Sequence, residues 1–128
     1  MLLAVALAIL AAPAAPAAVK DDRGEGGLVA RLDVNDHTPK AGEKWPIHIT
    51  AHDARGHRVH ASVRYAYLYG GEVVKRVDPH GPKGFVGEWR DHHFEWSKTT
   101  IGLELTFRAV VDSHLGQANL DYAVKVHR

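Results

Sequence analysis

The fold is decided by residues 103–111, LELTFRAVV, in which apolar side chains stand at every second position. Successive side chains of a strand point to opposite faces of its sheet, so this spacing predicts a half-buried antiparallel strand. The same alternation recurs in residues 45–52 (WPIHITAH) and 120–127 (LDYAVKVH), and more weakly in residues 28–34 (LVARLDV). After residue 19, no stretch keeps a helical period over three turns. The sequence therefore predicts an all-β fold.

Turn signals separate these strands along the chain. The clearest is Gly70-Gly71, which joins residues 61–69 to residues 72–77. Paired glycines accept positive φ, so this step predicts a two-residue hairpin. With residues 85–90 and 94–96 included, about seven strands follow one another at spacings near ten residues, which is typical of an antiparallel sandwich or barrel.

The two faces of the 61–77 hairpin are not cleanly apolar and polar. Direct pairing across Gly70-Gly71 sets Tyr67 opposite Val74 and leaves polar and apolar residues on both faces. We expect three alternating side chains and one near the loop to be buried: Val63, Tyr65, Tyr67 and Leu68. A β-bulge is the alternative that would reverse part of this pairing.

The size and composition of the chain predict a single domain without covalent crosslinks. The chain has 128 residues and no cysteine, which excludes disulfides, thiolate metal sites and a cysteine nucleophile. Its stability must then come from apolar burial and hydrogen bonds, and Trp45, Phe107 and Tyr122 are expected in the core. Lysine and arginine number 16 against 15 acidic residues, so nothing in the net charge of +1 indicates a nucleic-acid partner.

The first residues have the composition of an export leader. Residues 2–10 form a short apolar run, and Ala15-Pro16-Ala17 is an A-x-A-like cleavage site. The run is too short to cross a bilayer, which needs about 20 residues. We therefore expect a signal peptide over 1–17, a flexible linker over 18–27, and a secreted or extracytoplasmic domain over 28–128 that is not stably inserted in a membrane after cleavage. A buried alanine-rich helix is the alternative for the first segment.

Residues 38–63 (TPKAGEKWPIHITAHDARGHRVHASV) combine a turn, an alternating strand, an Asp-x-x-Gly turn and a second strand. Together with the closing stretches IGLELTFRAVV (101–111) and LDYAVKV (120–126), they resemble bacterial exported immunoglobulin-like domains. The resemblance implies an immunoglobulin-like β-sandwich of about seven strands. It also implies a non-enzymatic module for adhesion, spacing or protein contact.

The ten histidines are the anomaly in the composition. His48 and His52 share the outward face of one expected strand, where four residues place them roughly 13 Å apart. Two ligands of one metal ion cannot be so far apart, so a site requires cross-strand assembly, for instance of His48 or His52 with His57 or His60. A copper- or zinc-binding β-sandwich is therefore the alternative function, and solvated surface histidines with no cofactor are the expectation.

Histidine richness has a second consequence that needs no metal. Imidazole titrates near pH 6.5, so full protonation adds up to ten positive charges to a chain of net charge +1. This predicts stronger binding to an anionic polymer in acid.

A second candidate surface is aromatic. Its members come from the irregular region that follows residue 85, where exposed indoles and cations would bind a ligand by stacking: Trp89, Arg90, His92, His93 and Trp96. Packing of both indoles over the sandwich is the alternative.

The residues Asp112-Ser113-His114 have the composition of a catalytic triad but not its geometry. Three neighbours in one turn cannot align a nucleophile, a base and an orienting acid. We expect no enzyme, but a module that binds a protein or a cell-surface polymer, or that acts as a spacer.

Overall fold

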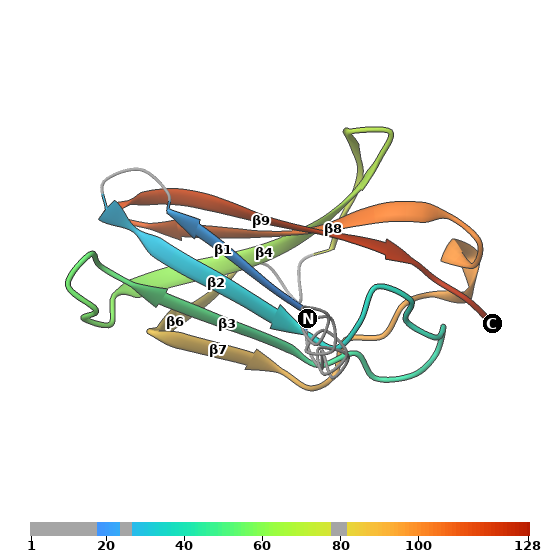
Figure 1. Ribbon diagram of the computed structural model, residues 1–128, viewed down its shortest axis with the longest axis horizontal. Helices are drawn as coiled ribbons and strands as arrows, with labels where there is room; N and C mark the ends of the chain where they lie inside the picture. Colours follow the sequence, from blue (N-terminus) through green and yellow to red (C-terminus); the bar gives the residue numbers. More distant parts are fainter. Residues whose placement is uncertain (1–17, 24–26, 78–81) are drawn as a thin grey trace, which may run out of the picture.

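The protein folds into two antiparallel β-sheets packed face to face (Figure 1). The computed structural model describes residues 18–23, 27–77 and 82–128. The predicted signal peptide, residues 1–17, lies outside them. In the described part of the chain no helix has the length and apolar character needed to span a membrane. The prediction of an all-β fold is confirmed.

The first sheet has four strands in the order β1-β2-β3-β7. They are β1 (Ala18–Arg23), β2 (Val29–Val34), β3 (Ile47–His52) and β7 (Glu88–Asp91). β1 occupies six of the residues for which the sequence predicts a flexible linker, and it pairs along its whole length with β2. The strand predicted at residues 28–34 therefore lies between two neighbours of this sheet, β1 and β3.

The second sheet has five strands, with β4 (His60–Tyr69), β8 (Glu104–Ser113) and β9 (Gly116–Lys125) as its long members. Two shorter strands, β5 (Glu72–Val77) and β6 (Lys83–Val86), both pair with β4. A short 3₁₀ helix, η2 (Lys98–Thr100), precedes β8. The expected strand at residues 103–111 is thus a central strand of this sheet, between β4 and β9.

The core between the sheets is built around Phe107, which is fully buried. Its ring centroid lies 5.1 Å from that of Tyr65, 5.3 Å from Trp45 and 5.7 Å from Phe94. Trp45, Phe107 and Tyr122 are at most 5% exposed, as predicted from alternation. Tyr65 and Phe107 belong to β4 and β8 of the five-stranded sheet, whereas Trp45 and Phe94 lie in the segments just before β3 and just after β7.

The β4–β5 hairpin turns at Gly70 and Gly71 with φ of 61° and 86°, as the sequence predicts. Val63, Tyr65, Tyr67 and Leu68 are all at most 7% exposed, which confirms the expected buried set. The direct pairing is wrong beyond the first two positions: Leu68 pairs with Val73, but Tyr67 pairs with Lys75. Val74 is the extra residue of a β-bulge, and its side chain is 57% exposed.

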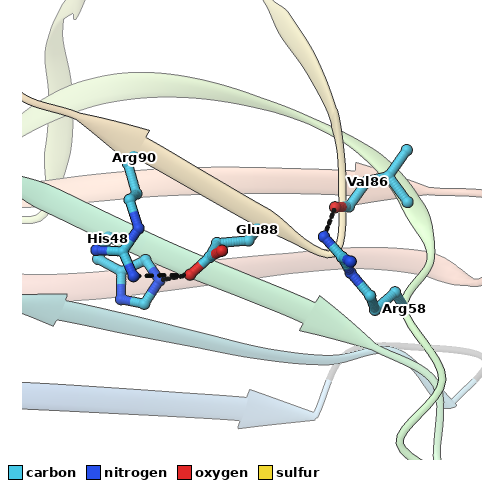
Figure 2. Close-up of polar contacts among 5 residues, drawn as sticks. All are labelled: His48, Arg58, Val86, Glu88 and Arg90. Carbon is cyan, nitrogen blue, oxygen red and sulfur yellow. Dashed lines mark hydrogen bonds and ion pairs between the residues drawn. The ribbon is translucent and has the colours of Figure 1, made fainter.

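Residues 85–90, expected as one strand, are divided between the two sheets at Gly87. This glycine has a φ of 73°; its N–H donates to the Val59 carbonyl (2.9 Å), and its own carbonyl accepts from Ala51 (3.0 Å). The Arg58 side chain lies over it and donates to the Val86 carbonyl at 3.1 Å (Figure 2). The positive φ and the close side chain together require glycine at the crossing.

A partly buried hydrogen-bonded group joins the two layers. The Tyr65 hydroxyl of β4 donates to Asp91 Oδ2 of β7 at 2.8 Å and accepts from Trp89 Nε1 at 3.0 Å. Burial raises the pKa of Tyr65 well above its ordinary value, so the hydroxyl keeps its proton and remains a donor.

Replacing Tyr65 by Phe should lower the free energy of unfolding by about 1–3 kcal/mol, because the Trp89 N–H loses its acceptor and Asp91 its donor. The control is Tyr67→Phe, whose hydroxyl has no hydrogen-bond partner among the described residues and whose removal should be nearly neutral. Denaturant unfolding measures both. Equal effects of the two substitutions would contradict the assignment.

Alanine at Gly87 should destabilise the fold more than alanine at Gly42. Both glycines have positive φ, which costs an alanine about 1–2 kcal/mol. At Gly87 the new Cβ would also lie 2.8 Å from Arg58 Cβ, whereas at Gly42 nothing lies within 4 Å. We expect an additional loss of roughly 1–3 kcal/mol for Gly87→Ala, measured by thermal and denaturant unfolding. Equal losses would show that Arg58 does not restrict this position.

Candidate functional site

The outer face of the four-stranded sheet carries a hollow of about 310 Å³ that is lined by polar residues. Its lining comes from alternate positions of two adjacent strands: Arg31 and Asp33 of β2, and His48, Thr50 and His52 of β3. The intervening residues of β3, Ile47, Ile49 and Ala51, are at most 1% exposed and face the core. Because alternation sends every other side chain outward, the packing of the core places these polar groups on one surface.

β7 extends this surface on the other side of β3. Register sets His48 opposite Arg90, and Thr50 opposite Glu88. We call the seven residues of this surface the histidine face: Arg31, Asp33, His48, Thr50, His52, Glu88 and Arg90.

Glu88 makes two polar contacts, one to His48 across the β3–β7 pair and one to Arg90 within β7. Its Oε2 lies 2.6 Å from His48 Nε2 and 2.9 Å from Arg90 Nη2 (Figure 2). The hydrogen bond from His48, assisted by the charge of Arg90, holds the pKa of Glu88 below its ordinary value. Since Glu88 is exposed, these contacts add little stability. Their effect is to set where the His48 ring and the Arg90 guanidinium lie.

The formal charge of the histidine face depends on its two imidazoles. Arg31 and Arg90 are balanced by Asp33 and Glu88, so the face is formally neutral when both histidines are neutral. With both protonated, the same face carries two positive charges.

The four histidines considered as metal ligands lie in two settings. His48 and His52 share the hollow, as expected for one strand face. His57 is exposed in the turn after β3, with Nδ1 3.3 Å from Asp53 Oδ2, and His60 is exposed at the start of β4. Within residues 18–23, 27–77 and 82–128 there is no group of three or more His, Asp or Glu side chains that could hold a metal ion.

The five residues of the expected aromatic surface are not brought together. Trp96 is 1% exposed and stacks on Tyr67 with ring centroids 4.9 Å apart, so it belongs to the core. Trp89 is half-buried, and its indole N–H donates a hydrogen bond to the Tyr65 hydroxyl. Arg90, His92 and His93 are exposed, and only Arg90 joins the histidine face.

Four residues of the histidine face were not predicted from the sequence: Arg31, Asp33, Thr50 and Glu88. A signal was present for Arg31 and Asp33, because both occupy outward positions of the alternating stretch at residues 28–34. Glu88 had no such signal, since its contact with His48 depends on β7 pairing with β3.

Comparison of the chain with models of protein families, with curated proteins and with solved structures finds no match. The site is therefore interpreted from its own chemistry.

Substituting His48 by Ala should raise the pKa of Glu88 toward its ordinary value, because the largest influence that lowers it is the His48 hydrogen bond. Part of the lowering should remain, since Arg90 is still present. Carboxyl ¹³C NMR over an acid titration measures this directly. His52→Ala is the control and should leave Glu88 unchanged; an unchanged pKa in His48→Ala would show that the contact is not made in solution.

Proposed function

We propose that this protein is a non-catalytic, extracytoplasmic immunoglobulin-like module that binds an anionic cell-surface polymer through the histidine face, and does so more tightly in acid. The observation that carries the proposal is the gathering of His48, His52, Arg31 and Arg90 on one outward surface of a sheet whose other surface is core.

Two features support the module and its compartment. Two antiparallel sheets around one apolar core, with a chain that crosses between layers, suit an immunoglobulin-like sandwich. The apolar run and A-x-A-like site within residues 1–17 support export.

The spacing of the cationic groups favours a polymer over a single small anion. His48 and His52 lie on the same strand with three residues between them, which corresponds to roughly 13 Å along an extended chain. One carboxylate or phosphate cannot contact both imidazoles. A polymer with repeating anionic groups can contact both at once, and its separate weak contacts then add.

The charges around each histidine favour acid dependence. His48 faces Asp33 on β2 and both Glu88 and Arg90 on β7, while on its own strand it shares the hollow with Thr50 and His52. His52 lies opposite Val29 on β2 and forms a backbone bridge with Arg58. Protonation of both imidazoles turns a formally neutral surface into a cationic one. An anionic chain is attracted only to the second state.

The test is retention of the full chain on a polygalacturonate matrix at pH 5 and pH 8 at fixed salt. Each exposed charge contact is worth roughly 0.5 kcal/mol, so two added charges predict about fivefold tighter binding at pH 5. The variant His48→Gln/His52→Gln should lose most of this pH dependence.

The matched control is His92→Gln/His93→Gln, which removes two exposed imidazoles that lie outside the histidine face. It should behave like the unmodified protein. Equal retention at both pH values would refute acid-dependent binding. Equal losses in the two double variants would show that net charge, and not this face, is responsible.

A further inference from the structure

The outer face of the five-stranded sheet holds a second hollow, of about 150 Å³, bordered by three arginines. Ala66 of β4 lies at its centre: in register, Arg76 of β5 is on one side of it and Arg108 of β8 on the other. Arg64 precedes Ala66 by two residues and therefore shares its face. We call Arg64, Arg76 and Arg108 around Ala66 the arginine cradle.

Two of the arginines are held in fixed orientations. Arg108 makes a bidentate pair with Asp121, with N···O distances of 2.7 and 2.9 Å. Arg64 donates to Asp112 Oδ2 at 2.7 Å, and Asp112 Oδ1 accepts from Gln117 at 2.6 Å. A guanidinium has five N–H donors, so both arginines retain donors beyond those used by the aspartates.

Arg76 differs from the other two. Its side chain is exposed on the edge strand β5 and has no hydrogen bond or ion pair to any other described residue. Among the described residues, three arginines against two aspartates leave the cradle with one positive charge that no carboxylate pairs. One monovalent anion restores neutrality.

The floor of the hollow is apolar. Ala66 and Val110 are 6% and 7% exposed, although both lie on the outer side of the sheet. A charge-assisted hydrogen bond that lies against this floor is shielded from water on that side and gains strength from the lower local dielectric. The methyl of Ala66 also leaves room that any larger side chain at this position would fill.

We propose that the arginine cradle binds the carboxylate of a small organic ligand, with the Arg76 guanidinium contacting it as a planar fork. Arginine matches a planar carboxylate in two parallel hydrogen bonds, and the small volume admits one such group and little more. Two sources share this chemistry, a uronic acid residue and the C-terminus of a peptide. The site is separate from the histidine face, which lies on the other sheet.

The experiment is an amide NMR titration of the full chain with glucuronate and, separately, with N-acetylglycine. Saturable shifts at Ala66, Arg108 and Val110, with a dissociation constant on the order of 1 mM, are expected. The probe that binds more tightly identifies the source, and equal affinities identify a bare carboxylate site. Inorganic phosphate is titrated in parallel, and tighter binding of phosphate would overturn the assignment to carboxylates.

Three variants distinguish binding at the arginine cradle from nonspecific attraction by the charge of the protein. Arg76→Gln should weaken binding about tenfold, as expected for loss of a bidentate contact. Arg55→Gln removes an exposed arginine in the β3–β4 turn and should change nothing. Ala66→Val keeps every charge but fills the hollow, so it should weaken binding as well. Amide chemical-shift changes that rise linearly with ligand concentration, without saturation, and are equal in the unmodified protein and all three variants would refute the proposal.

The pH dependence of carboxylate binding distinguishes this proposal from the proposed function. Arginine stays protonated throughout the accessible range, so the affinity for glucuronate should be the same at pH 6 and pH 8. Substitution of His48 and His52 should not alter it. An affinity that falls at pH 8 and disappears in His48→Gln/His52→Gln would place the binding on the histidine face instead.

Discussion

Aromatic packing around Phe107 is the interaction on which the rest of the structure depends. Tyr65, Trp45, Phe94 and Trp96 surround it with ring centroids 5.1–6.1 Å away, and together they bridge both sheets. Each aromatic pair adds about 0.5–1.5 kcal/mol beyond apolar burial, in a chain that has no cysteine to crosslink. This cluster and the apolar side chains packed around it occupy the space between the sheets, so the alternate side chains of the strands face outward. Both proposed binding surfaces follow from it.

The core could be predicted from the sequence because alternation is a local property of each strand. Phe107 and Tyr122 could be assigned to the buried face without knowing which residues they contact. The bulge at Val74 and the crossing at Gly87 depend on packing between segments distant in sequence, such as Arg58 over Gly87. The pattern of apolar residues within one strand does not contain these long-range contacts. Residues 85–90 were therefore predicted as a single strand.

The same distinction applies to the candidate sites. That His48 and His52 share a face follows from their spacing, whereas the contact of His48 with Glu88 follows only from the order of the strands. Trp96 shows a signal that was present and not used: Phe94 and Trp96 flank Glu95, so both aromatics point to the same, buried side. The arginine cradle was invisible because its members lie on three strands.

The two surfaces differ in how they respond to pH, and this difference has a structural cause. Charge on the histidine face depends on imidazoles, while charge on the arginine cradle depends on guanidinium groups that do not titrate. Coupling between two sites requires an element with two arrangements that both ligands bias. In the described residues a buried apolar core lies between the two sheets, and no such element is seen between the two surfaces. Under both proposals, acid therefore strengthens polymer binding on one layer and leaves carboxylate binding on the other unchanged.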